Sequence, residues 1–258
     1  MYPQSVSTLL ADSSSLFYQP LYFQAVKRHG PIHSGIDLFP TSFATAPAAV
    51  VVGAAVTKLG KYRWSIWGGW YLSTLGFGLM ILFDVGTSTA CWVAVTLIMG
   101  FGTGMLATGL MFAIQAATPA ADQAYAVSLF TFFRAAGQCT GVAVGGTIFQ
   151  NAMKYQIQQY SSIMSHADEY SKDATQVVEI LRTFSDGPAK TDLIQSYADA
   201  LKNVWMLACA LSGIGLLASL CTQHFSLDMV LDTEQGLEHR RDGNKVYDRV
   251  VGVGELEA

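Results

Sequence analysis

Charge is the scarcest feature of this 258-residue sequence. Only 13% of the residues are charged, whereas 51% are hydrophobic and the mean hydropathy is +0.33. Between Leu38 and Met153, 116 residues carry six charges, and the other 142 residues carry the remaining 28. A water-exposed surface could hardly be built from the first set, so we expect an all-α integral membrane protein. The net charge of −4, without a basic patch, excludes nucleic acid as a partner.

The residue patterns of enzymes and metal proteins are also missing. The four cysteines lie one to an apolar stretch without a C-x-x-C pair, and all five histidines lie outside the apolar runs. These positions argue against a disulfide framework, a zinc site and an intramembrane Ser-His dyad. The sequence also has no H-E-x-x-H, P-loop or G-x-S-x-G motif and no intramembrane aspartate pair. We therefore expect no catalysis, cofactor or metal, which leaves a transport or structural role.

Long uncharged runs predict six membrane-spanning helices. A helix needs roughly 20 mostly apolar residues to cross the hydrocarbon core. The predicted spans are residues 4–26, 38–57, 64–83, 90–115, 123–150 and 202–223. The first span has two interpretations, because only 14 uncharged residues separate Asp12 from Lys27. It is either a short, poorly inserted helix or a complete span that begins near Gln4, with Asp12 facing protein.

The polar segments define the remaining organisation. Residues 1–223 are predicted to form one six-helix bundle, interrupted by an extramembrane loop at 151–201 that holds eleven charges. In this loop, Val177, Val178, Leu181 and Phe184 recur at helical spacing, which fits either a surface amphipathic helix or an ordinary loop helix. Residues 224–258 form a polar tail. Basic residues divide almost evenly between the two sides, so the positive-inside rule does not fix the orientation.

The fifth span carries a regular series of glycines. Gly137, Gly141 and Gly145 are four residues apart, with Gly146 beside the last. This spacing places them on one helix face, where another backbone can approach closely, and so predicts a helix-packing seam. The fourth span has further glycines, Gly100, Gly102, Gly104 and Gly109, which indicate a second thin, flexible or closely packed segment.

Five polar or aromatic residues are candidates for a substrate path or for proton coupling. Arg134 is the one charge well inside a span, and it either contacts substrate or protons or serves as a structural, snorkelling arginine. Gln138 lies one turn further along, and Gln115 ends the adjoining span. Such amides either bind ligand or hold helices together. Tyr18 and Tyr22 flank Pro20 and are candidates for lining a cavity.

The segment from Gly53 to Arg63, GAAVTKLGKYR, resembles the second-half copy of the major facilitator superfamily signature, with Thr57 in place of its aspartate. The resemblance continues through FYQPLYFQAV at 17–26, FAIQAATP at 112–119 and LFTFFRAAGQCTGVAVGGTIFQN at 129–151. Together these segments look like the fungal drug:proton antiporter branch with fourteen spans. The missing aspartate weakens the expected charge relay, and Val142 after Gly141 departs from the Gly-Pro pair of the antiporter motif.

This resemblance implies the C-terminal half of a transporter built from two bundles. It implies a cytoplasmic gating loop with Gly53, Lys58, Gly60, Lys61 and Arg63, a cytoplasmic tail, and an external 151–201 segment. The implied function is proton-coupled efflux of small hydrophobic drugs or toxic metabolites. The implied partners are the lipid bilayer, substrate, protons and an N-terminal bundle, in the plasma membrane or the vacuolar membrane. The alternative is a truncated or partner-dependent half-bundle without transport activity of its own.

Overall fold

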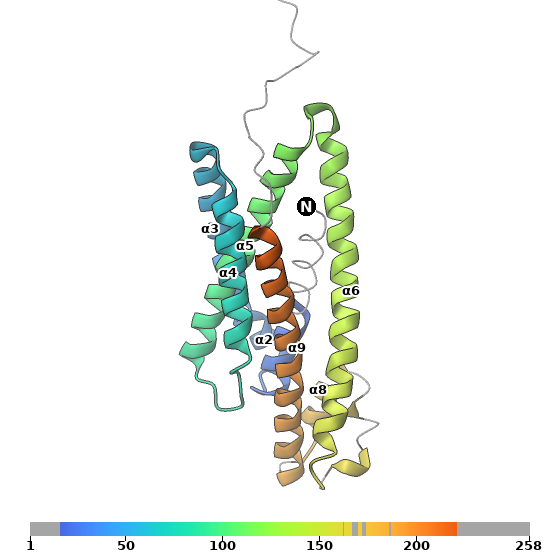
Figure 1. Ribbon diagram of the computed structural model, residues 1–258. Helices are drawn as coiled ribbons and strands as arrows, with labels where there is room; N and C mark the ends of the chain where they lie inside the picture. Colours follow the sequence, from blue (N-terminus) through green and yellow to red (C-terminus); the bar gives the residue numbers. More distant parts are fainter. Residues whose placement is uncertain (1–15, 162, 167–169, 172–173, 186, 221–258) are drawn as a thin grey trace, which may run out of the picture. The chain divides into compact units, whose positions relative to one another are not determined.

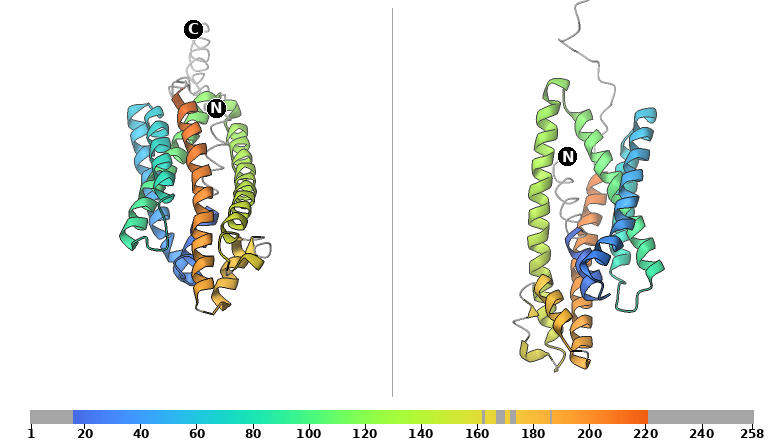
Figure 2. Two further views of the ribbon diagram at one scale, coloured as in Figure 1. Left: turned by 60° about the horizontal axis from the view of Figure 1, so that its bottom comes forward. Right: turned by 180° about the vertical axis from the view of Figure 1, so that it is seen from behind.

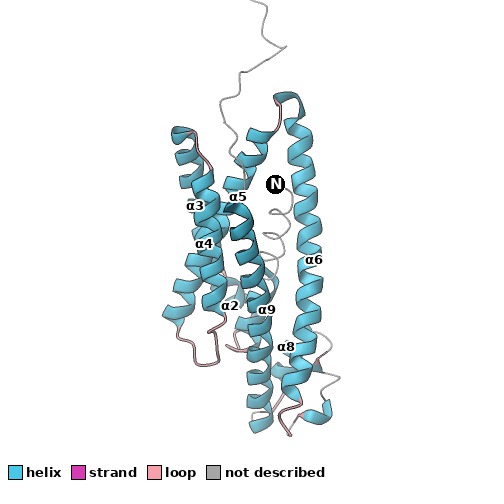
Figure 3. Ribbon diagram, viewed as in Figure 1, coloured by secondary structure: helices cyan, strands magenta, loops and turns pink. Residues whose placement is uncertain are grey.

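The computed structural model describes residues 16–161, 163–166, 170–171, 174–185 and 187–220. Within these residues the chain is built from helices and connecting loops, without a β-strand (Figures 1 and 3). This confirms the predicted all-α fold class. After a helix at residues 16–25, the helices are α2 (Pro31–Asp37), α3 (Phe39–Leu59), α4 (Arg63–Met80), α5 (Thr89–Ala117), η1 (Ala120–Asp122), α6 (Gln123–Ile157), η2 (Met164–His166), α8 (Ala174–Thr183) and α9 (Pro188–Leu220).

Four helical stretches in the described part are long and apolar enough to cross a membrane. They are Pro31–Leu59, Thr89–Ala117, Gln123–Ile157 and Pro188–Leu220. Large apolar side chains such as Phe39, Val50 and Leu217 are exposed on them, as expected where lipid replaces water. Helix α4 is not among the four, because its tryptophans, glycines and serines lower its hydropathy. The six exact spans therefore stay a prediction, and the predicted start near Gln4 and the 224–258 tail lie outside the described residues.

Two helices extend well into the segment predicted as a loop at 151–201. Helix α6 continues to Ile157, and α9 begins at Pro188. The uncharged-run criterion began the sixth span only at residue 202, because Lys190, Asp192 and Asp199 interrupt the apolar pattern before it. Charges do not end a helix, however, and α9 includes all three residues. Helix α8 buries Val177, Val178 and Leu181, the residues whose spacing predicted an amphipathic helix. The side of the membrane on which this segment lies stays a prediction.

Helix α5 packs between α3 and α4 by close backbone contact at its glycines. A Cβ atom added to Gly100 would lie 2.5 Å from the Thr41 carbonyl oxygen of α3. One turn further along, a Cβ atom added to Gly104 would lie 2.5 Å from the Thr45 carbonyl oxygen. On the other side, a Cβ at Gly102 would lie 2.6 Å from the Ser73 amide nitrogen of α4. Larger residues would push these helices apart, so the glycines of the fourth predicted span form a closely packed segment.

Helix α9 lies between α4 and α6 (Figures 1 and 2). Trp70 of α4 is fully buried against it, and a Cβ added to Gly215 of α9 would lie 2.3 Å from the indole ring. One turn away, the Trp67 indole nitrogen donates a hydrogen bond to the Ser219 carbonyl oxygen at 3.2 Å. On its other side, α9 places Tyr197 edge-on to Phe149 of α6, with ring centroids 4.9 Å apart. Aromatic contacts to both neighbours therefore fix the position of α9.

The contact between Trp70 and Gly215 generates a test of helix packing. We expect Gly215→Ala to lower the free energy of unfolding by about 1 to 3 kcal/mol, because its methyl group overlaps a fixed indole ring. Gly213→Ala is the matched control on the same helix, since a Cβ there meets nothing within 4 Å. Alanine also favours the helix by about 0.5 to 1 kcal/mol, so the control should unfold at the same temperature or higher. Thermal unfolding in detergent measures both, and equal midpoints would contradict this contact.

Candidate functional site

The end of α3, the turn that follows it and the start of α4 contain the five residues predicted to gate the cytoplasmic side. Gly60 ends α3 in the left-handed conformation, with φ of 64°, and its amide donates to the Val56 carbonyl oxygen at 2.9 Å. Glycine adopts this conformation without Cβ strain, so the chain can turn at once into α4. Lys58 and Lys61 are exposed and make no ion pair with the described residues. Both ammonium groups are therefore accessible from outside the chain.

The other members of this loop have more local roles in the structure. Thr57, at the position of the family aspartate, donates its hydroxyl hydrogen bond to the Gly53 carbonyl oxygen of its own helix at 2.8 Å. A Cβ at Gly53 would meet nothing within 4 Å. The guanidinium carbon of Arg63 lies 4.8 Å from the centre of the Trp67 ring, a cation–π contact. A gating function for the loop stays a prediction.

The two candidate tyrosines are both packed in the core. Tyr18 donates from its hydroxyl to the Val142 carbonyl oxygen of α6 at 3.2 Å and stacks on Phe149. Tyr22 donates to the Asp84 carbonyl oxygen at 2.9 Å and packs on Phe83. Both side chains are about 1% exposed. They join the first described helix to its neighbours, and a role in contacting substrate stays a prediction.

The glycine face of α6 is directed inward. Gly137, Gly141 and Gly145 are buried, in line with Phe149 and Met153, whereas Gly146 is half-buried. A Cβ at Gly145 would lie 2.8 Å from the Tyr18 ring. At Gly146 the same atom would lie 3.4 Å from the Tyr18 hydroxyl oxygen. The absence of a side chain at Gly145 therefore makes room for an aromatic ring of the helix at residues 16–25.

Arg134 differs from these packed residues because its side chain is exposed on α6. It makes no hydrogen bond or ion pair with the described residues. Gln138, one turn further along the helix, and Gln115 near the end of α5 are both half-buried. Arg134 and Gln138 share a helix face by their four-residue separation. Among the described residues, no hydrogen bond joins either of them to Gln115.

The structure also contains a polar cluster that sequence reasoning missed. It surrounds Asp84, in the turn between α4 and α5. The Asp84 carboxylate accepts hydrogen bonds from the Val85 amide at 2.8 Å and from the Gln195 side chain at 3.1 Å. Lys27 donates to the Val85 carbonyl oxygen at 2.9 Å. On α9, the Lys202 ammonium lies 4.0 Å from Asp84 and 2.7 Å from Asp199.

This cluster joins residues from three distant parts of the sequence, and no local spacing connects them. Its two central groups have shifted pKa values. Burial alone would raise the pKa of the Asp84 carboxyl. Hydrogen bonds from Val85 and Gln195, with the positive charges of Lys202 and Lys27, outweigh burial, so the net pKa lies below its usual range. Burial lowers the pKa of Lys27, and the nearby Asp84 carboxylate opposes that change.

The cluster predicts a specific dependence of stability on pH. Because the folded-state pKa of Asp84 is lowered, its stabilisation is present above the unfolded pKa, about 4, and is lost as the pH falls through the folded value. We therefore expect Asp84→Asn to lower the unfolding midpoint by a few degrees at pH 7 and by progressively less below about pH 4.

Asp122→Asn is the control for this experiment, because Asp122 is exposed and its side chain does not cap α6. Its midpoint should follow that of the unmodified chain from pH 7 to pH 3. Differential scanning fluorimetry in detergent measures all three proteins. If the unfolding midpoint of Asp84→Asn stays below that of the unmodified chain by the same amount down to pH 3, the carboxylate charge is not the source of the stabilisation.

Long apolar helices, a close-packed glycine core and apolar outer faces define an integral membrane protein of the helical type. No protein-family model matches the chain. Curated proteins do: it is 47% identical over 225 residues to "MFS transporter L2" of Phoma sp., a match covering 87% of this chain and 38% of that protein. Over this stretch the chain belongs to the major facilitator superfamily.

Two further relatives are named as efflux proteins. The chain is 33% identical over 243 residues to "Efflux pump FUS6" of Gibberella moniliformis, and 31% identical over 243 residues to "MFS efflux transporter aclA" of Aspergillus oryzae. Each match covers 92% of this chain and 43% of the relative. The chain thus spans about two fifths of the length of the curated relatives it matches.

Proposed function

We propose that this chain forms the C-terminal part of a major facilitator exporter that moves small hydrophobic drugs or toxic metabolites across a membrane. The main support is the 47% identity to a fungal transporter, together with the names of the two efflux relatives. The signature-like loop at 53–63 supports the second-half position. Coupling to protons and placement in the plasma membrane, with the vacuolar membrane as the alternative, follow from the family resemblance.

Arg134 supports a role for the face of α6 on which it lies. The residue belongs to a 35-residue apolar helix and is exposed, without a partner among the described residues. An arginine at the bilayer centre costs about 2.5 to 3.5 kcal/mol on insertion scales, and this cost falls when the side chain meets protein or water. We infer that Arg134 and Gln138 border a wet cavity that a second bundle closes, and that substrate passes there.

Efflux by a chimera tests this proposal. This chain would replace the corresponding part of the Phoma transporter, and export of rhodamine 6G and of a panel of hydrophobic compounds would be measured in yeast that lacks its own pumps. We expect the chimera to export at least one compound and a protonophore to abolish that export. Loss of export with normal membrane insertion would contradict the efflux proposal. Protonophore-resistant export would contradict proton coupling alone.

Arg134 variants in the same chimera test the proposed cavity. We expect export per folded molecule to fall several-fold in Arg134→Lys, because lysine keeps the charge but loses the planar guanidinium group with its paired hydrogen-bond donors. In Arg134→Gln, which loses both the charge and the guanidinium group, export should fall at least tenfold. The unfolding midpoint should change little, because the side chain has no described partner to lose. Thr147→Val is the control on the opposite face of α6, and its export should be unchanged. Normal export by Arg134→Gln would show that Arg134 does not contribute to the substrate path.

The second candidate function is a half-bundle without transport activity of its own, supported by the chain's coverage of about two fifths of its relatives. Expressing the chain alone beside the chimera distinguishes the two. If the chain alone exports nothing while the chimera does, the chain acts only as part of a larger transporter. If the chain alone forms a stable homodimer that exports, it has transport activity of its own, and the second candidate function is wrong.

A further inference from the structure

The contact between α4 and α9 contains a group of buried polar atoms that the packing alone does not explain. Within the part of the chain that the structure describes, five side-chain nitrogen or oxygen atoms are fully buried without a hydrogen-bond partner, and all five belong to α4 or α9. They are Arg63 Nε, Trp70 Nε1, Ser73 Oγ, Thr74 Oγ1 and Ser212 Oγ. A buried polar group without a partner destabilises a fold, and lipid offers no substitute for the lost water.

Three of these residues lie on the surfaces that α4 and α9 turn toward each other. Trp70 of α4 packs against Gly215 of α9. Further along, the Cys209 thiol of α9 donates to the Thr74 carbonyl oxygen of α4 at 3.6 Å. Ser212 is 0% exposed and lies three residues from both Cys209 and Gly215, on the same face of α9. Trp70, Thr74 and Ser212 thus belong to one contact, which we call the α4–α9 seam.

Helix geometry does not account for the unpaired hydroxyl groups of the seam. A serine or threonine within a helix can donate to the carbonyl oxygen three or four residues before it. Ser196, on α9 itself, does so, with its hydroxyl 2.8 Å from the Asp192 carbonyl oxygen. Thr74 and Ser212 have equivalent carbonyl groups before them in their helices, yet their hydroxyls have no partner among the described residues.

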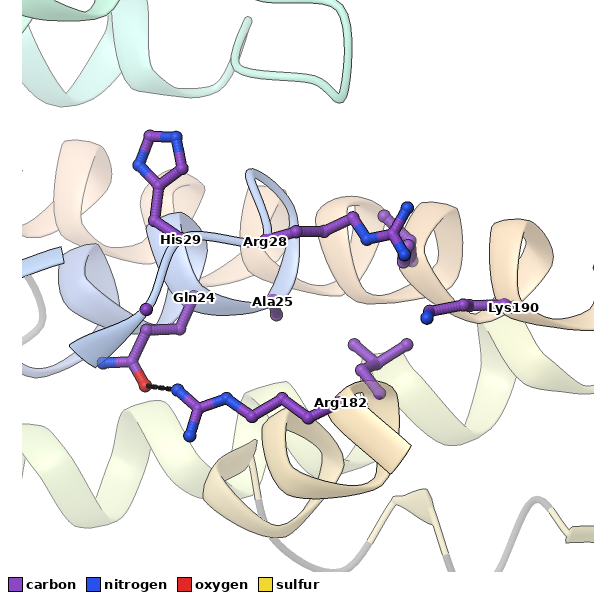
Figure 4. A pocket seen from close by; sticks show the side chains of 9 residues that line it. Gln24, Ala25, Arg28, His29, Arg182 and Lys190 are labelled. Carbon is purple, nitrogen blue, oxygen red and sulfur yellow. Dashed lines mark hydrogen bonds between the residues drawn. The ribbon is translucent and has the colours of Figure 1, made fainter. Parts of the chain in front are cut away.

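A polar cavity elsewhere in the chain shows the more usual arrangement. It has a volume of about 330 Å³ and lies beside the loop that follows the first described helix. On its wall, Arg182 donates to the Gln24 side-chain oxygen at 3.2 Å (Figure 4). Lys190, also on the wall, donates to the Phe184 carbonyl oxygen at 2.9 Å. Protein partners hold the long polar side chains there, which the hydroxyls of the α4–α9 seam lack.

The seam is tight at one end and loose at the other. At the tight end, a Cβ added to Gly215 would lie 2.3 Å from the Trp70 ring. At the loose end, a Cβ added to Gly78 would lie 3.7 Å from the Cys209 sulfur, an ordinary contact distance. A groove of about 360 Å³ opens there, lined by Tyr71, Thr74, Leu75, Gly78, Leu79 and Leu216. Few close contacts therefore hold α9 against α4 on the side of the groove.

We propose that the α4–α9 seam is a conformational joint, in which α9 moves away from α4 along the groove and water then reaches the hydroxyls of Thr74 and Ser212. The closed arrangement keeps these hydroxyls unpaired. The open arrangement bonds them to water and gives up the weak hydrogen bond from the Cys209 thiol. Because gain and loss oppose each other, the two arrangements exchange as a two-state element, with the Trp70 contact as its hinge. None of these four residues belongs to the predicted substrate path or gating loop, so the joint does not depend on the proposed efflux.

Removal of an unpaired hydroxyl tests the closed arrangement. Ser196→Ala is the matched control for Ser212→Ala, because both serines are 0% exposed on α9 but only Ser196 has a bonded hydroxyl. Alanine favours the helix equally at both positions, so the comparison isolates the hydroxyl bond. We expect the unfolding midpoint of Ser212→Ala in detergent to exceed that of Ser196→Ala by a few degrees, and Thr74→Val not to lower the midpoint. If Ser212→Ala and Ser196→Ala lower the midpoint equally, the Ser212 hydroxyl has a partner and the proposal is wrong.

Chemical labelling of Cys209 tests the opening itself. The full chain keeps Cys209 as its one thiol when serine replaces the other three cysteines, Cys91, Cys139 and Cys221. In nanodiscs this chain is treated with a charged, water-soluble methanethiosulfonate. Such a reagent does not enter lipid, and it reacts with a thiolate, which needs water. Reaction of Cys209, which lies within the uncharged run at 203–223, therefore reports water in the seam.

We expect slow labelling of Cys209 in the folded chain. Ser212→Ala should slow it by about threefold or more, because the closed arrangement gains stability, and Ser196→Ala should leave the rate unchanged. Absence of labelling in the folded chain, with full labelling after denaturation in SDS, would show that the seam does not open and that the proposal is wrong. Equal rates in Ser212→Ala and the chain with Ser212 intact would also contradict it. The labelling of the chain with Ser212 intact stays decisive should the seam variant not fold.

Discussion

Close backbone contact at the glycines of α5 holds the arrangement of α3, α4 and α5 together. Lipid offers no hydrophobic drive for helices to associate, so contact distance and hydrogen bonds decide how they pack. At Gly100 and Gly102, the α5 backbone comes so near its neighbours that a single methyl group would not fit. The same approach lets the Thr45 hydroxyl of α3 reach the Gly100 carbonyl oxygen at 3.1 Å. Small residues thus set both the packing and the polar contacts between these helices.

In other helix contacts, large aromatic rings fill the space between neighbouring helices. Trp70 fills the space opposite Gly215, and Tyr18 fills the space opposite Gly145, so each large ring is matched by a missing side chain. The Tyr18 hydroxyl donates a hydrogen bond to the Val142 carbonyl oxygen, whereas the buried Trp70 indole nitrogen has no partner among the described residues. The Asp84 cluster adds charged contacts where the chain leaves the apolar region. In contrast, Arg134 extends from α6 without a described partner, and this contrast distinguishes it from the structural polar residues.

Membership in a transporter family follows from similarity, whereas the detailed function does not. The motifs at 53–63 and 129–151 were sufficient to recognise the family, because they combine glycines and charges at spacings that ordinary apolar helices do not require. The signature did not predict, however, which contacts its own residues make in the folded chain. Thr57 bonds only within its helix, and Arg63 lies over Trp67, so the loop's chemistry depends on neighbours from both α3 and α4.

Composition and periodicity by themselves determined that the protein is helical, apolar and membrane-embedded, because the bilayer forces each backbone polar group to bond within its own helix. They also identified the inward glycine face of α6, since a four-residue spacing maps directly onto one side of a helix. Only the tertiary structure decided that α9 begins fourteen residues before the predicted span, at Pro188, that Tyr18 and Tyr22 are packed in the core, and that Asp84 meets Gln195. The tyrosine packing and the contact between Asp84 and Gln195 depend on which helices become neighbours, and contacts between residues 62 to 124 positions apart leave no local pattern in the sequence.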